Sequence, residues 1–203
     1  MRIMLEKEAE DFLEKNKFSV VKRTVVTKEK DVKKEAKRIG FPLVMKVTNT
    51  LHKTEKKGVV VGITEESIQE NYKKIAKKSK KVMFQRQLDG KELILGIKKD
   101  PVFGHTILVG AGGVYTEFVR DIALRICPIT RVDAQEMLEE LKIYKILTGT
   151  RKTKVVNTAS VINVLIKLSK LVEKYKKIKE LDINPLIVNE VEARIADARI
   201  IFE

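Results

Sequence analysis

The sequence predicts an α+β fold, in which hairpins of neighbouring strands alternate with amphipathic helices. Two apolar runs, residues 43–47 and 58–63, flank a polar segment in the pattern of a hairpin. Apolar side chains recur at helical spacing along residues 161–175, the strongest helical pattern in the chain. Strands that pair with their sequence neighbours favour this class over a parallel doubly wound sheet.

The predicted elements of the first half have recognisable ends. Gly40 should stop a lysine-rich helix over residues 28–39, because glycine readily adopts the conformation that follows a helix end. Thr64 is a suitable N-cap for a further helix. From the N-terminus we expect helix 3–16, extended segment 19–22, helix 28–39, strands 43–47 and 58–63, and a helix from 64 to about 78.

Turn signals divide the second half of the chain. Asp89-Gly90 predicts a hairpin between strands 83–88 and 93–97. Asp100-Pro101 predicts another turn, before a strand that begins near residue 107. The remaining predicted elements are strand 122–126, helices 133–142 and 161–175, and strands 178–188 and 192–202.

The composition predicts a globular cytoplasmic protein. The chain has 203 residues, of which 43% are hydrophobic and 34% charged, enough for one large or two small domains. No apolar run reaches the length of about 18 residues that predicts a membrane span, and the N-terminus lacks the apolar stretch of a signal peptide. The single cysteine, Cys127, suits a reducing compartment, and its apolar surroundings favour a buried structural thiol.

The net charge of +14 favours a partner that carries phosphate. A basic balance attracts nucleic acid, anionic membranes or phosphorylated small molecules. The lysines are spread along the chain, however, and aromatic residues make up only 5% of it, so few side chains could stack on bases. We therefore expect no nucleic acid and no membrane as partner.

The stretch from residue 107 to 125 carries a cluster of glycines followed by acidic residues. Clustered glycines allow positive φ angles and a close approach of the backbone to a ligand. Glu117 and Asp121 follow at a spacing that could reach what the loop holds. A tight turn would also explain the glycines, and an ordinary strand or helix surface would explain the two acids. The glycines are Gly110, Gly112 and Gly113.

Four separated motifs resemble, in the family's order, the ATP-grasp domain of the β subunit of ADP-forming acyl-CoA synthetases such as acetate-CoA ligase. They resemble the succinyl-CoA synthetase β subunit more distantly. The resemblance implies an ATP-grasp domain over residues 1–203, with two α+β subdomains that enclose a nucleotide cleft and an inner, nucleotide-capping subdomain at about residues 20–85. The motifs are FPLVMKV, LHKTEKKGVVVGI, DPVFGHTILVGAGGVYTEFVRDIALRICPI, and ELDINPLIV followed by ADARI.

The resemblance implies several nucleotide contacts. Lys46 matches a lysine that offsets the charge of the ATP or ADP phosphates. Residues 83–88 match a strand that pairs with adenine, and Glu92 matches a carboxylate near the ribose. The three glycines would admit the transferring phosphoryl group. A strand-end lysine that reaches solvent and a surface glutamate are the alternatives for Lys46 and Glu92.

Asn184 and Asp197 match the residues that hold the Mg²⁺ of the nucleotide. Magnesium prefers hard oxygen ligands and leaves several positions to phosphate and water. An asparagine within the apolar strand 181–188 would bury an amide without a partner unless a ligand or a turn satisfies it. A turn at Asn184-Pro185 that ends the strand is therefore the alternative.

The resemblance also implies a phosphohistidine that arrives from a partner. Asp182 matches an acidic residue that orients this imidazole, since a carboxylate bonded to one ring nitrogen fixes the tautomer. His52 matches a histidine thought to carry phosphate in relay, and Glu117 could orient the incoming ring. A surface residue is the alternative for His52, and we expect His105 to be structural or incidental.

These residues together imply a catalytic β subunit, an acid–thiol ligase in a hetero-oligomer. It would bind Mg-ADP or Mg-ATP and exchange phosphoryl with the phosphohistidine of a CoA-binding α subunit, which couples acyl-CoA (acetyl-CoA) cleavage to ATP synthesis. The chain departs from the family at Lys57 and Arg86, which bears on activity and nucleotide preference. The alternative function is a non-catalytic ATP-grasp-like module that binds nucleotides or polyanions.

Overall fold

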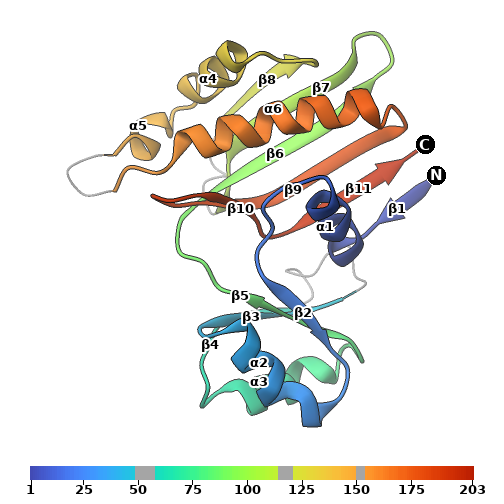
Figure 1. Ribbon diagram of the computed structural model, residues 1–203, viewed down its shortest axis with the longest axis vertical. Helices are drawn as coiled ribbons and strands as arrows, with labels where there is room; N and C mark the ends of the chain where they lie inside the picture. The colour runs from blue at the N-terminus through green and yellow to red at the C-terminus, as the bar shows by residue number, and fades with distance from the viewer. Residues whose placement is uncertain (49–57, 114–120, 150–153) are drawn as a thin grey trace. The chain divides into compact units, whose positions relative to one another are not determined.

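The structure is a computed structural model that describes residues 1–48, 58–113, 121–149 and 154–203. The chain forms two compact units (Figure 1). The larger unit contains Met1–Val20 and Asp89–Glu203, and the smaller contains Val21–Leu88. The nucleotide-capping role expected for residues 20–85 stays a prediction.

The larger unit is built on an antiparallel seven-stranded sheet in the order β1-β11-β9-β6-β7-β8, with β10 also paired to β9. The long strand β9 lies near the middle of this sheet and pairs with β6 on one side and β11 on the other. The strands are β1 (Arg2–Met4), β6 (Lys91–Asp100), β7 (Gly104–Ala111), β8 (Ile122–Ile126), β9 (Ile178–Val188), β10 (Ala193–Ile195) and β11 (Ala198–Phe202).

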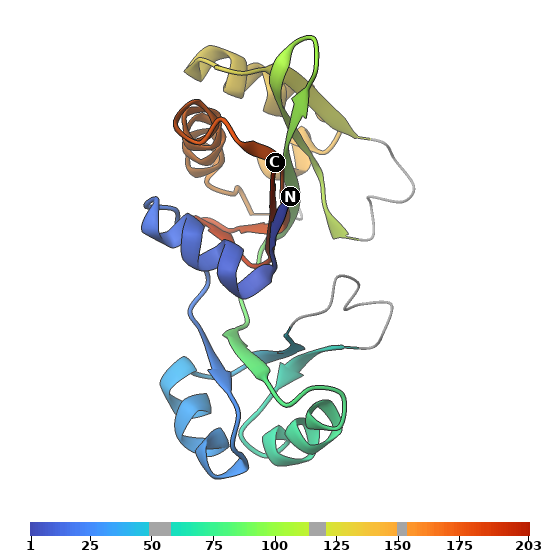
Figure 2. The same cartoon turned by 90° about the vertical axis from the view of Figure 1, so that its right-hand side faces the viewer.

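Helices cover one face of this sheet, as Figure 2 shows for the blue α1, the olive α4 and the orange-brown α6. Their apolar stripes and the inward side chains of the strands form one core, in which Leu165 of α6 and Leu181 of β9 are fully buried. A capping box between Thr130 and Asp133 begins α4. The helices are α1 (Glu6–Lys15), α4 (Arg131–Glu139), α5 (Tyr144–Leu147) and α6 (Thr158–Lys174).

Side chains alternate between the two faces of each strand, and this alternation decides which residues of β9 can meet a ligand. Leu181 and Ile183 enter the core, whereas Asp182 and Asn184 are exposed on the opposite face. We call this second face of the larger sheet the open face. The exposed side chains of Ile122, Leu124 and Ile126 lie on it along the edge strand β8.

The smaller unit has its own four-stranded sheet in the order β2-β5-β3-β4, with a separate core under two helices. The predicted hairpin of β3 and β4 is confirmed, and Gly40, at φ +93°, follows α2 as expected. The elements are β2 (Arg23–Val26), a 3₁₀ turn η1 (Glu29–Asp31), α2 (Val32–Ile39), β3 (Leu43–Val47), β4 (Val59–Ile63), α3 (Ile68–Ala76) and β5 (Val82–Arg86).

The hairpin predicted at Asp89-Gly90 is wrong, because β5 and β6 belong to different sheets. The turn signal instead lies where the chain re-enters the larger unit. There Gly90 passes so close to β9 that a Cβ would lie 2.5 Å from the carbonyl oxygen of Val188. At the other connection, Val20 forms a bridge with Ile195 of β10.

Three smaller expectations also differ from the structure. Residues 2–4 form a strand, since they pair with β11, and the first helix begins only at Glu6. The helix α3 begins after Ser67 rather than Thr64, whose backbone N–H donates to the Ser67 hydroxyl. The predicted strand 192–202 is divided into β10 and β11 by Ala196 and Asp197.

No helix in the described part of the chain combines the length and the apolarity that crossing a bilayer requires.

Candidate functional site

Asp182 is a carboxyl group on the open face with a raised pKa. Strand register places it between Gly96 of β6 and Arg199 of β11. Although the side chain reaches solvent, the surrounding protein partly desolvates its carboxyl and raises the pKa above the ordinary value; Arg199 opposes this shift, and Asp197 and Glu180 add to it. A carboxylate with a raised pKa is a stronger proton acceptor than an ordinary aspartate.

Asn184 and Asp197 lie next to each other in the larger unit. The backbone N–H of Asn184 donates to the carbonyl oxygen of Asp197 over 3.2 Å. The pairing of β9 with β6 shifts register beside Asn184, and β9 then continues to Val188, so Asn184-Pro185 does not end the strand. The bulge takes Asn184 out of the regular ladder, and the alternation of β9 places its side chain on the open face.

The donor set of this pair fits magnesium. An amide and a carboxylate offer hard oxygen atoms, and Mg²⁺ commonly takes only one or two protein ligands beside phosphate and water. Within the described ranges no group of three or more His, Cys, Asp or Glu side chains could hold a metal by itself. A metal at this pair would therefore depend on oxygen atoms supplied by a nucleotide.

A cavity of about 430 Å³ lies beside the glycine cluster, and we call it the glycine-loop cavity. It brings together three residues predicted to contact the nucleotide, namely Glu92, Gly112 and Gly113. The backbone N–H of Gly112 donates to the carbonyl oxygen of Glu92 over 2.9 Å, which fixes the two strands at this edge. The full lining is Gly90, Lys91, Glu92, Ala111, Gly112, Gly113, Ile143, Ile146 and Leu147.

Internal packing accounts for glycine at two of the three cluster positions. A Cβ on Gly110 would lie 2.8 Å from the carbonyl oxygen of Asp121, and one on Gly112 would lie 2.9 Å from the backbone of Glu92. Gly113 differs, because its φ of +67° is itself unfavourable for other residues and its Cβ would meet the carboxylate of Glu92 at 2.9 Å. Gly113 and Glu92 thus border the cavity together.

Asp121 is a buried residue of the larger unit. Its Oδ1 accepts the backbone N–H of Lys142 over 2.7 Å, and its Oδ2 accepts that of Ile143 over 3.0 Å. The carboxylate is thus buried and bonded within the fold, rather than presented to what the glycine loop holds. The alternative of an ordinary surface position is wrong.

Lys46 lies in the smaller unit, on β3, and its side chain is only 7% exposed. Its neighbours across the sheet are Met83 of β5 and Val59 of β4. Burial contradicts the alternative of a strand-end lysine that reaches solvent. Its contact with a nucleotide stays a prediction. His52 and Glu117 lie outside the described residues, and their roles stay predictions too.

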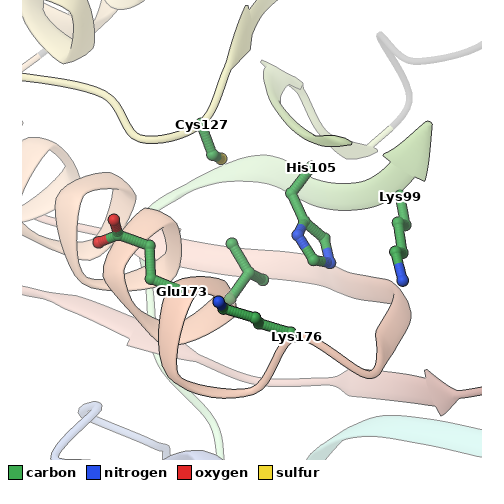
Figure 3. A pocket seen from close by; sticks show the side chains of 6 residues that line it. Lys99, His105, Cys127, Glu173 and Lys176 are labelled. Carbon is green, nitrogen blue, oxygen red and sulfur yellow. The ribbon is translucent and has the colours of Figure 1, made fainter. Parts of the chain in front are cut away.

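His105 lines a second cavity, of about 320 Å³, together with Lys99, Cys127, Val172, Glu173 and Lys176 (Figure 3). Its Nε2 lies 2.7 Å from the carbonyl oxygen of Ile178 and donates to it in the Nε2–H tautomer, which gives this histidine a structural role. Cys127 is partly buried, and desolvation raises the pKa of its thiol. The hydrogen bond of His105 agrees with its expected structural role, whereas Cys127 is less buried than expected.

The sequence did not reveal the apolar part of the glycine-loop cavity. Ile143, Ile146 and Leu147 come from α5 and the residue before it, a helix too short to produce a helical pattern. Only the fold brings these residues beside Glu92.

The chain is similar in sequence to ADP-forming acetate–CoA ligases. It is 34% identical over 213 residues to the Pyrococcus furiosus acetate–CoA ligase (ADP-forming) I subunit beta, covering 98% of this chain and 92% of that subunit. It is 38% identical over 205 residues to the Archaeoglobus fulgidus acetate–CoA ligase (ADP-forming) II, covering 98% of this chain. The chain spans only 30% of the length of that second relative.

Solved structures agree with these relatives. The acetyl-coenzyme A synthetase 1 of Ca. Korarchaeum cryptofilum, in complex with coenzyme A, Ca-AMPCP and HgCl⁺, matches with a TM-score of 0.92 and 32% identity over 100% of this chain and 94% of that chain. A second structure of that enzyme, with coenzyme A and Mg-AMPPCP and its phosphohistidine segment pointing towards the nucleotide binding site, matches with a TM-score of 0.86 and 32% identity over 99% of this chain and 93% of that chain.

The ATP-grasp domain family matches residues 1–202, nearly the whole sequence. The predicted α+β fold with the ATP-grasp architecture is therefore confirmed, and the chain belongs to the ATP-grasp domain family.

Proposed function

We propose that this chain is the β subunit of an ADP-forming acyl-CoA synthetase, with acetyl-CoA as a substrate of the assembled enzyme. The observation that carries the proposal is the match to a separate β subunit over 98% of this chain and 92% of that protein. The glycine-loop cavity supports it, because three residues expected at the nucleotide converge there. The complete reaction converts acyl-CoA, ADP and phosphate into the free acid, CoA and ATP.

The glycine-loop cavity would receive part of the nucleotide. Glu92 supplies a carboxylate that can accept hydrogen bonds from ribose hydroxyls, and Gly113 leaves room beside it. The ammonium of Lys46 would offset phosphate charge, as positioning and charge neutralisation dominate phosphoryl transfer.

Asn184 and Asp197 would hold magnesium through their side-chain oxygen atoms. When bound, the metal supplies positive charge that offsets the charge of the phosphates. The protein's own part is to present the two side chains from a bulge and a strand break that adjoin each other.

Asp182 would accept the N–H of the visiting imidazole and so leave the other ring nitrogen to exchange phosphoryl with the nucleotide. The raised pKa of Asp182 strengthens its carboxylate as a hydrogen-bond acceptor. The imidazole would come from a CoA-binding subunit, in a hetero-oligomer of the cytoplasm. His52 would carry phosphate in relay, and Glu117 would help to orient the arriving ring.

Reconstitution tests the proposal directly. The purified chain is mixed with the CoA-binding subunit of an ADP-forming acetate–CoA ligase, and ATP formation from ADP, phosphate and acetyl-CoA is measured. We expect ATP only when both subunits and magnesium are present. Magnesium-dependent nucleotide binding without ATP formation by any such pair would favour a non-catalytic binding module instead.

A further inference from the structure

Asp121 is a buried carboxylate that the proposed mechanism leaves without a task. It is 5% exposed, and both of its oxygen atoms accept backbone hydrogen bonds, from Lys142 at 2.7 Å and Ile143 at 3.0 Å. Hydrogen bonds to an ionised acceptor are stronger than those between neutral groups. Asp121 therefore fixes the backbone immediately before α5.

The backbone of the same residue holds the other side of the glycine-loop cavity. The carbonyl oxygen of Asp121 accepts the N–H of Ala111 over 3.1 Å, at the end of β7. Gly110 packs directly against that carbonyl, since a Cβ there would come within 2.8 Å of it. One residue thus links the strand that leads to Gly112 with the segment that carries Ile143.

Both linked segments line the cavity. Ala111, Gly112 and Gly113 contribute backbone, and Ile143, Ile146 and Leu147 contribute an apolar wall. Apolar walls with a few placed polar groups are typical of small-molecule sites, in which a flat ring packs on the aliphatic side chains. The width of this cavity depends on how the segment before α5 is held relative to β7.

We infer that Asp121 is a positioning residue for nucleotide binding, which sets the apolar wall at Ile143 against the glycine side of the cavity. The inference rests on the proposed function, because it takes the glycine-loop cavity as part of the nucleotide site. Asp121 itself does not line the cavity and acts through Ile143. Its substitution should therefore alter affinity as well as stability.

Asp121→Asn is the first test, because an amide is isosteric but can accept only one of the two N–H groups with its oxygen. Binding of Mg-ADP to the full chain is measured by calorimetry, well below the unfolding temperature of each variant. We expect an affinity about tenfold lower, the scale of losing one hydrogen bond to a charged group. Asp133→Asn is the matched control, since it weakens the capping box of α4 but lines no cavity, and it should leave the affinity unchanged.

Ile143→Ala tests the same inference without altering Asp121, and it decides the matter if Asp121→Asn does not fold. It should weaken Mg-ADP binding. The double variant should lose less binding free energy than the sum of the losses in the two single variants. Unchanged affinity in Ile143→Ala, or strictly additive losses, overturns the inference while the proposed function stands. Absence of Mg-ADP binding by the wild-type chain overturns both.

Discussion

The two candidate regions of the larger unit obtain their chemistry in opposite ways. Around Asn184 and Asp197, the chemistry comes from polar side chains outside the core, whereas Leu181, Ile183 and Leu186 of β9 enter the core. Around Gly112, backbone segments lie directly against each other, and most of the glycines are required because a Cβ would collide with a neighbouring backbone. Function should therefore be separable from stability in the first region and inseparable from it in the second.

The largest effect should follow from Asn184→Ala or Asp197→Ala. Loss of an oxygen ligand should reduce ATP formation by about 100-fold or more and raise the magnesium requirement. Mutation of residues that only contact a metal ligand already lowers metal affinity or activity by about 10–100-fold. ATP formation by the reconstituted enzyme is measured against magnesium concentration.

Asn189→Ala is the matched control for these variants. The Asn189 side chain accepts the N–H groups of Val191 and Glu192 in a turn after β9, so its loss should lower stability alone. An unchanged magnesium dependence in Asn184→Ala and Asp197→Ala would refute the metal assignment.

An intermediate effect is expected from Gly112→Ala, which should lower stability and nucleotide affinity together. The added methyl group would lie 2.9 Å from the backbone of Glu92, and such overpacking typically costs about 1–3 kcal/mol of unfolding free energy. Urea unfolding and calorimetric titration with Mg-ADP measure the two losses.

Gly104→Ala provides the comparison for this variant. Gly104 also has a positive φ, +76°, but a Cβ there would have no atom within 4 Å. The substitution should lower the unfolding free energy by only about 1 kcal/mol, through backbone strain, and should leave nucleotide affinity unchanged. Equal behaviour of the two variants would show that close packing at Gly112 has no bearing on the site.

The smallest effect on stability concerns Asp182. Because its pKa is higher in the folded chain than in the unfolded chain, its ionisation opposes folding, and this penalty builds up as pH rises from the unfolded pKa to the folded pKa and is complete above it. Asp182→Asn should therefore raise the unfolding temperature at pH 7 relative to the wild type, with the difference vanishing at acidic pH, while ATP formation falls. Thermal unfolding across this pH range would contradict the expectation if the difference grew towards acid.

Local patterns predicted most of the fold because most of its elements are defined locally. Strand β8 and the hairpin of β3 and β4 follow from apolar runs between polar segments. The turn signal at Asp89-Gly90 failed, since a two-residue motif carries no information about the strands with which β6 pairs. Besides β7, β6 pairs with β9, whose paired residues lie more than 80 positions later in the sequence.

The candidate site, like the fold, could be predicted from the sequence only in part. The polar pair at Asn184 and Asp197 could be predicted, because a polar residue in an apolar strand stands out in the sequence and the two strands are close in sequence. The wall at Ile143 could not, since an apolar residue in a short helix resembles any other. The buried position of Asp121 was also hidden, because its hydrogen-bond donors are backbone groups that no sequence motif marks.

The bridge between Val20 and Ile195 and the close passage of Gly90 along Val188 have a consequence for how this architecture can change. The chain leaves the larger unit beside β10 and returns beside β9, and these strands are themselves paired, with Ala193 facing Val188. In topological terms, the smaller unit is an insertion between two neighbouring points of the larger sheet. Such a module can be lengthened, exchanged or deleted by recombination without a change in the strand order of the larger sheet.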